Sequence, residues 1–398
     1  MATTDPIPGV TDESARPGAG LLVVLSAMPS EQLQSVLSKL MHSFLAEDLI
    51  VAIPEGLPAD AYPSLRIVAA PAANPSWMLS AADFVNAYQL AEKNQAHAIV
   101  MLGPESGSLS SSAIRELGDA ALAQHIDLAV PRYDLPPHAR LITSAMLYPL
   151  SRTLFATRVR LPLVLDLGLS LRMAERLAGV ANRFTPLNQG EALLWPVNEA
   201  AVSGFAIRQV DAGPRAQFQT TGVDLNSVLP LVVGSLFSDI EAKAAFWQRV
   251  RQLPPALNPV PMPQAPATDA TAEIASMLQA FRLAYTNLQE VWGLVLPPSS
   301  LLGLKRLSAT DGAAFRMPDS LWVRIVFDFL LAYRLRTINR GHLLGALIPL
   351  YLAWVASHFN IIASGTDPEY HIEAVAAAFE ADKAYIVSRW RWPDRFNP

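Results

Sequence analysis

The sequence predicts an α/β region built on a mostly parallel sheet, followed by an all-helical region. In the first half, short apolar runs alternate with amphipathic stretches, which is typical of alternating strands and helices. Six prolines fall within residues 253–269, where neither a helix nor a central strand can form. After this segment, apolar residues recur at helical spacing. We therefore expect a disordered tail at 1–19, an α/β domain at 20–252, a linker at 253–269 and a helical domain at 270–398.

The first expected elements are a strand, a helix and a second strand. Residues 21–26 and 49–53 are short, bounded apolar runs, as buried strands are. Between them, residues 30–45 place apolar side chains at helical spacing, with Ser30 as the expected N-cap. This order predicts parallel strands with covered faces, and ligands bind beyond the carboxyl ends of such strands.

The same alternation continues along the chain. A strand is expected at 65–69, a helix at 80–94 and a strand at 98–102. The loops in which a ligand would bind are therefore 26–30, 54–60 and 103–108. After the linker, helices are expected at 271–292, 320–337, 342–359 and 369–390.

Composition argues against several classes of protein. The formal charge of −5 and a pI near 5.8 argue against a protein that binds nucleic acid. The chain has no cysteine, which excludes disulfides and thiolate metal sites. The most apolar run, 343–357, contains Pro349 and is shorter than the roughly 20 residues of a membrane span, so we expect a buried helix there. Residues 1–19 lack the features of a signal peptide, so a cytoplasmic protein is expected.

One acidic residue stands in a markedly apolar segment. Asp166 lies within RVRLPLVLDLGLS, residues 158–170. An unpaired carboxylate there would cost several kcal/mol on desolvation, so Asp166 must cap a helix, accept backbone hydrogen bonds or face a cleft. The capping role is open because a helix is expected shortly after it, at 171–177.

Two parts of the chain resemble one family of enzymes. LYPLSR at 147–152, together with residues 158–170, is similar to the pattern YPLTR...VRQPIGGDFGFS of GT-A glycosyltransferases related to glucosyl-3-phosphoglycerate synthase and mannosylglycerate synthase. NRGHLLGALIPLYL at 339–352 resembles the run NRDHLL…LTPLYLGR of the same family. The resemblance implies a GT-A fold, a nucleotide-sugar donor such as UDP-glucose or GDP-mannose, and a small, glycerate-like anionic acceptor. It also implies that Asp166 is catalytic and lies beside the donor sugar.

The resemblance further implies where the nucleotide sugar binds. Glu55 and Asp60 correspond to two aspartates of the family's VNSDGGSTDGT segment, and Ser26 follows the first strand. On the residues alone, the segment around Glu55 can equally be a solvated turn built on two prolines.

The family's Asp-X-Asp metal motif corresponds to MLGPESGSL, residues 101–109. Gly103 replaces the first aspartate and Glu105 the second, so one carboxylate remains for the nucleotide sugar and for Mg²⁺ or Mn²⁺. On the residues alone, Glu105 can also be an ordinary loop residue.

Three arginines are candidate cations for the acceptor or the phosphates: Arg140, Arg152 and Arg160. The alternative is that Arg152 and Arg160 are exposed charges that flank a core strand.

Two functions are compatible with these residues. The first is a glycosyltransferase that moves a hexose from a nucleoside diphosphate to a small anionic acceptor. The second is a catalytically inactive protein of the same fold, a binding or assembly module, because the family's Asp-X-Asp is reduced to Glu105 and its Gly-Lys-Gly and metal-binding histidine have no counterparts. The apolar helical region also suggests a homodimer.

Overall fold

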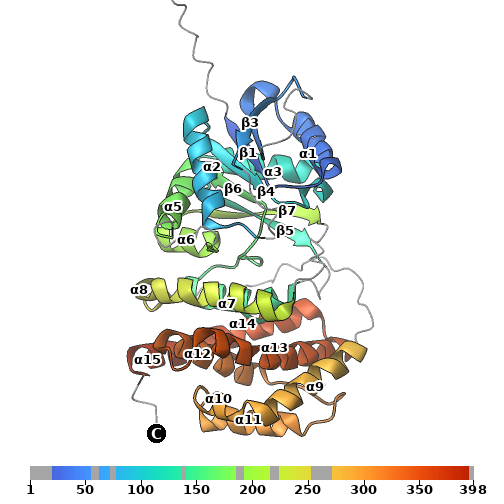
Figure 1. Ribbon diagram of the computed structural model, residues 1–398, viewed down its shortest axis with the longest axis vertical. Helices are drawn as coiled ribbons and strands as arrows, with labels where there is room; N and C mark the ends of the chain where they lie inside the picture. The colour runs from blue at the N-terminus through green and yellow to red at the C-terminus, as the bar shows by residue number, and fades with distance from the viewer. Residues whose placement is uncertain are drawn as a thin grey trace, which may run out of the picture.

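The computed structural model describes residues 20–54, 62–71, 78–135, 140–184, 192–215, 224–251 and 271–393. These residues form a sheet flanked by helices and, next to it, a stack of helices (Figure 1). The predicted fold class, an α/β region followed by an all-helical region, is confirmed. The predicted tail and linker lie outside the described residues.

The sheet that these residues form has seven strands. They are β1 (Leu21–Leu25), β2 (Leu49–Pro54), β3 (Arg66–Ala70), β4 (Ala98–Leu102), β5 (Leu128–Asp134), β6 (Leu167–Ser170) and β7 (Ile207–Pro214). Their order is β3-β2-β1-β4-β6-β5-β7, and only β6 runs antiparallel to its neighbours. The strand order reverses between β1 and β4, which makes this point a topological switch point, the usual place for a ligand in an open α/β sheet.

Helices cover both faces of the sheet. α1 (Ser30–Ser43) and α3 (Ser111–Leu122) lie on one face, and α2 (Ala81–Asn94) and α5 (Leu171–Ala181) on the other. β1 alternates accordingly, because Leu22 belongs to the α2 and α5 core, while Leu21 and Val23 belong to the α1 and α3 core. Two further helices are α4 (Tyr148–Phe155) and α6 (Pro196–Ser203); α4 packs against α6 and against α14 of the helical region.

The all-helical region runs from α7 to α15. Its helices are α7 (Leu225–Ala242), α8 (Ala244–Trp247), α9 (Thr271–Asn287), α10 (Gln289–Gly293), α11 (Pro298–Ser308), α12 (Asp319–Leu335), α13 (Arg340–Ala363), α14 (Pro368–Ala381) and α15 (Lys383–Arg391). The core of this region contains the fully buried Trp322 and Trp354. α4 joins the same core through Leu154 and Phe155, and Trp322 Nε1 donates to the backbone oxygen of Ala145 at 2.9 Å. A segment of the α/β half is therefore part of the helical core.

Some details differ from the expectations. Ser30 is not the N-cap of α1 but its first residue, because Pro29 occupies the N-cap position and provides no side-chain hydrogen bond. The helix expected at 369–390 is divided into α14 and α15, which meet at Asp382. The helix expected at 271–292 is likewise divided, into α9 and α10.

Among the described helices, α7 and α13 have the length and hydropathy of a membrane span. In the most apolar window of α13, 67% of the residues are buried inside the protein, compared with 39% in α7. The prediction of a buried helix around Pro349 is confirmed.

Candidate functional site

The carboxyl ends of β1 and β4 meet at the switch point. The backbone N–H of Ser26, just after β1, donates to Leu102, the last residue of β4, at 2.9 Å. The chain continues from β4 into Gly103 and Glu105, and the N–H of Gly103 donates to Asp166 Oδ1 at 2.7 Å. Three of the predicted site residues, Ser26, Glu105 and Asp166, therefore lie along one edge of the sheet.

A buried ion pair satisfies the carboxylate of Asp166. Asp166 has no exposed surface, and its Oδ2 accepts a hydrogen bond from Arg215 Nε at 2.6 Å and another from the hydroxyl of Tyr133. Asp166 does not cap the following helix, because the N-cap of α5 is Ser170, whose side chain accepts from Met173 N at 3.1 Å. The capping alternative is therefore wrong, and the carboxylate instead holds Arg215.

The environment fixes the charges of this pair. Burial by itself lowers the pKa of Arg215, but the charge and hydrogen bonds of Asp166 outweigh it and raise that pKa above its usual value. Burial and the nearby carboxylate raise the pKa of Tyr133 well above 10. Arg215 is thus a cation at neutral pH and Tyr133 a neutral hydrogen-bond donor.

The position of the first motif aspartate has no room for a side chain. A Cβ atom on Gly103 would lie 2.6 Å from Leu165 Cβ and 3.0 Å from a guanidinium nitrogen of Arg215. Glu105 is half-buried and precedes the short 3₁₀ turn at Ser106–Ser108. No group of three His, Cys, Asp or Glu side chains among the described residues could hold a metal ion. The guanidinium of Arg215 thus lies next to Gly103, where the family's Asp-X-Asp motif has its first carboxylate.

The predicted acceptor cations are each paired with carboxylates of α14. Arg140 and Arg160 share Glu369, at 2.6 Å and 3.2 Å respectively. Arg152 pairs with Glu373 and Glu380. The guanidinium groups are buried, so the alternative that Arg152 and Arg160 are exposed is wrong.

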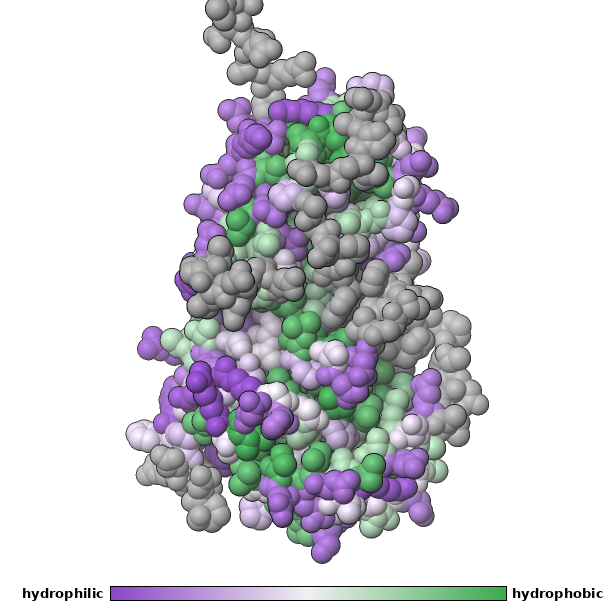
Figure 2. Space-filling model, in the orientation of Figure 1, coloured by the Kyte–Doolittle hydropathy of each residue, from purple (hydrophilic) through white to green (hydrophobic). Residues whose placement is uncertain are grey.

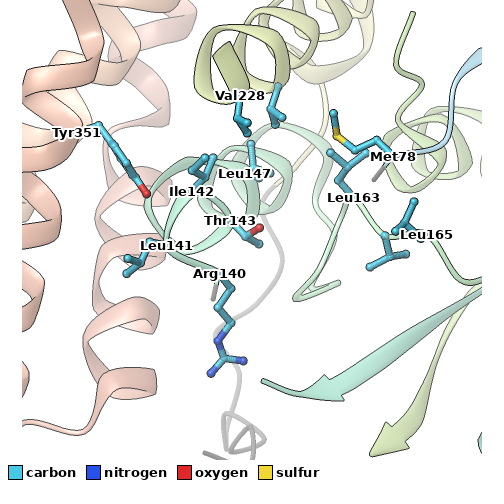
Figure 3. A pocket seen from close by; sticks show the side chains of 12 residues that line it. Met78, Arg140, Leu141, Ile142, Thr143, Leu147, Leu163, Leu165, Val228 and Tyr351 are labelled. Atoms are coloured by element: carbon cyan, nitrogen blue, oxygen red, sulfur yellow. The ribbon is translucent and has the colours of Figure 1, made fainter. Parts of the chain in front are cut away.

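A cavity of about 330 Å³ lies between the carboxyl edge and the helical region. Its lining residues are Met78, Arg140, Leu141, Ile142, Thr143, Leu147, Leu163, Val164, Leu165, Val228, Val232 and Tyr351. They come from the loop before α2, residues 140–142 and the π-helical turn Thr143–Leu147 that follows them, the loop before β6, and helices α7 and α13 (Figure 3). π-Helical turns occur often at functional sites. Sequence reasoning predicted Arg140 but did not find this mostly apolar cavity.

A second, small cavity of about 30 Å³ lies at the carboxyl ends of β1, β2 and β4. Ser26, Asp83 and Asn86 are its polar lining residues, and it shares the edge of the sheet with Glu105. Glu55 and Asp60, the other predicted nucleotide-binding residues, lie outside the described residues.

A larger cleft, of about 710 Å³, is bounded by α5, α6, α7 and α12. Four of its charged groups form ion pairs: Lys243 contacts Glu199 at 3.0 Å and also pairs with Asp239, and Arg176 contacts Glu199 at 2.7 Å. None of the predicted site residues lines this cleft.

Fold and site together define a mixed α/β protein whose strand order reverses between β1 and β4. No family model matches the chain, and no curated protein matches it. Among solved structures, the chain is similar to glucosyl-3-phosphoglycerate synthase from Mycobacterium tuberculosis.

In its complex with phosphoglyceric acid, the enzyme is 17% identical in sequence to this chain. The match covers 57% of this chain and 81% of the enzyme chain, with a TM-score of 0.35. The complex with Mn²⁺, UDP-glucose and phosphoglyceric acid is 16% identical, with 63% and 92% covered and a TM-score of 0.37. Both structures are of an enzyme from the family that the sequence resembles. Similarity at this level assigns no activity to the chain.

Proposed function

We propose that the protein is a glycosyltransferase that binds a nucleoside-diphosphate hexose at the β1/β4 edge and transfers the hexose to a small acceptor. The main support for this proposal is the strand order, which reverses between β1 and β4. In open α/β sheets, ligands bind in the crevice at such a reversal. Ser26, Glu105 and Asp166 lie along this one edge.

The nucleoside is expected beside Ser26, Asp83 and Asn86, whose hydroxyl, carboxylate and amide groups suit the edge of a base or a ribose. The first turn of α1 begins next to the same edge without a side-chain cap, so its backbone N–H groups can bind phosphate. UDP-glucose and GDP-mannose are the donors to test first. Glu55 and Asp60 stay predictions for the same subsite.

A metal ion held by the protein does not fit the described residues of this edge, because Glu105 is the one carboxylate that follows β4. We therefore derive no step through Mg²⁺ or Mn²⁺. Arg215 offers the leaving diphosphate a positive charge instead, and Asp166 holds its guanidinium in place. Asp166 would reach the sugar itself only if Arg215 moved away.

The transfer exchanges one bond for another at the sugar. A hydroxyl oxygen of the acceptor forms a bond to the anomeric carbon, and the bond from that carbon to the diphosphate oxygen breaks. The nucleoside diphosphate leaves with the bonding electron pair, and the proton of the hydroxyl passes to the diphosphate or to water. Arg215 stabilises the negative charge that develops on the leaving group.

An anionic acceptor would need cations that are already paired. Arg140, Arg152 and Arg160 stay the predicted contacts for a glycerate-like anion, but such an acceptor must compete with Glu369, or with Glu373 and Glu380.

One observation favours the second candidate function, a binding module without activity. Both carboxylate oxygens of Asp166 are bonded within the protein and the residue is fully buried. Without a carboxylate at the sugar, several kcal/mol of transition-state stabilisation would be lost.

Isothermal titration calorimetry with UDP-glucose and GDP-mannose, with Mg²⁺ and with EDTA, tests the proposal. We expect one donor to bind in both conditions, and Arg215→Gln to weaken binding at least about tenfold, since hydrogen bonds to charged groups contribute roughly 1.5–3 kcal/mol. Arg172→Gln is the matched control, because Arg172 pairs with Asp127, which precedes β5 and so lies at the opposite edge of the sheet. If neither donor binds, the glycosyltransferase proposal is refuted and the binding module is the remaining candidate function.

A homodimer is a further part of the proposal. Leu283, Leu294 and Leu302 of the helical region are exposed by 64%, 63% and 49%. Figure 2 shows apolar side chains gathered on the face of the helical region in that view. Light scattering of the purified protein would measure the number of chains in the particle.

A further inference from the structure

The cavity of about 330 Å³ beside the carboxyl edge has an apolar interior. Of its twelve lining residues, nine are Leu, Ile, Val or Met. Figure 3 shows Leu147, Val228, Met78 and Leu163 around the open space, whereas the guanidinium of Arg140 extends away from them. The surface that an occupant would contact is therefore mostly hydrocarbon.

Arg140 does not offer a positive charge to an occupant of this cavity. It is the one charged residue among the twelve described lining residues, and its guanidinium contacts Glu369 at 2.6 Å. Burying a carboxylate or phosphate without a free cation costs several kcal/mol. The electrostatics of the cavity therefore select an uncharged molecule.

Two hydroxyl groups, those of Thr143 and Tyr351, line the cavity without a hydrogen-bond partner among the described residues. Tyr351, on α13, is 4% exposed and lines the cavity, and its hydroxyl makes no hydrogen bond within the described part of the chain. Burial alone raises its pKa well above 10, so the hydroxyl is neutral. The hydroxyl is not one of the side-chain oxygens that are buried without a partner, because it is open to the cavity, where a ligand hydroxyl could bond to it.

The position of the cavity connects it with the nucleotide-sugar edge. Leu163 and Leu165 form the wall on the sheet side, and Leu165 directly precedes Asp166. Leu165 also lies against Gly103, the residue that follows β4. An occupant of the cavity would thus lie next to the place proposed for the donor sugar.

We propose that this cavity binds the acceptor, and that the acceptor is an uncharged, largely apolar alcohol or phenol whose hydroxyl bonds to Tyr351. This inference rests on the proposed function. The size agrees with it, because the cavity has about twice the volume of the ~150 Å³ cavity known to take one benzene ring, enough for a ring with a short alkyl chain.

Calorimetry in the absence of any nucleotide sugar tests the cavity by itself. The probes at pH 7 are 4-butylphenol, 4-butylbenzoate, which has a similar shape but carries a negative charge, and glycerate, a small polar anion. We expect 4-butylphenol to bind, and the two anions to bind more than about 100-fold more weakly, because neither finds a free cation.

Two variants locate the bound phenol. Tyr351→Phe keeps the ring and removes the hydroxyl, so the affinity for 4-butylphenol should fall about 2- to 10-fold. Val228→Phe places a ring in the cavity and should abolish binding. Leu231→Phe is the matched control on the same helix, because Leu231 is 50% exposed and lines the other cleft, and binding should be unchanged.

The outcomes separate this inference from the proposed function. Equal or tighter binding of 4-butylbenzoate, no binding of the phenol, or binding that survives Val228→Phe would overturn the inference even if UDP-glucose or GDP-mannose binds. Binding of the phenol with the expected variant pattern supports the cavity as an apolar site. If neither nucleotide sugar binds, the proposed hexose transfer is refuted, whereas the assignment of the cavity to an uncharged alcohol or phenol is retained.

Discussion

Glu369 on α14 is predicted to stabilise the contact between the two halves of the protein. Its carboxylate accepts hydrogen bonds from Arg140 and Arg160, which belong to the α/β half and whose side chains are 1% and 7% exposed. The change to test is Glu369→Gln, which keeps the shape of the side chain and removes its charge. Two buried guanidinium groups then lose their common partner.

The expected loss is large because the arginines cannot reach water. Removing one partner of a buried ion pair typically costs about 3–5 kcal/mol, since the charge that remains is buried and uncompensated. Glu373→Gln provides a matched comparison on the same helix. There Arg152 keeps Glu380, at 2.9 Å, so we expect a smaller loss, about 1–2 kcal/mol.

Urea denaturation followed by circular dichroism measures both variants at pH 7. An unchanged m-value would show that the variants unfold from the same folded state. A loss below about 1 kcal/mol for Glu369→Gln, or equal losses for the two variants, would refute the reasoning, because it would mean that the shared carboxylate does not compensate the buried charges.

Three further predictions concern other parts of the molecule. Burial, together with the neighbouring His371, lowers the pKa of His358 to about 3, so this side chain stays neutral in the folded protein while the unfolded chain binds a proton below about pH 6.5. As the pH is lowered from about 6 to about 4, this residue alone should reduce the free energy of unfolding by up to about 1.4 kcal/mol per pH unit. Denaturation curves at several pH values should show a smaller pH dependence for His358→Phe. Gly103→Ala should destabilise the protein by about 1–3 kcal/mol, because the new Cβ would lie 2.6 Å from the Leu165 side chain. Gly179→Ala is the control and should not destabilise the protein, because the space around Gly179 is open. Equal melting temperatures for the two variants would contradict this prediction. Asp166→Asn should cost about 3–5 kcal/mol by removing the carboxylate that the buried Arg215 contacts at 2.6 Å, and a melting temperature equal to that of the wild type would show that the pair is dispensable.

Much of the fold could be predicted from the sequence because local patterns determine it. The strand expected at 98–102 is β4 itself, and the helix expected from residue 80 is α2, with Ser80 as its cap. The predicted N-cap at Ser30 was wrong by one residue, because the spacing of the apolar side chains does not show whether the helix begins at Ser30 or after it. The antiparallel strand β6 was not predicted, because four residues in an apolar run carry no period that identifies a strand.

The candidate site was predictable only in part. The cost of burying a carboxylate indicated that Asp166 must have a partner, and this was correct. The identity of Arg215 could not be predicted, because it lies 49 residues further along the chain. The pairing of Arg140 with Glu369 spans 229 residues, so no local signal could show that the predicted acceptor cation is already neutralised.

The segment from Thr143 to Phe155 has a consequence for motion. It leaves the sheet after β5, lines the cavity with its π-helical turn and then enters the core of the helical region, where Trp322 bonds to Ala145. The two halves are thus joined by a shared piece of interior rather than by a free hinge. Opening one half away from the other would expose apolar side chains of α4 to water, so we expect the two halves to move together as one body.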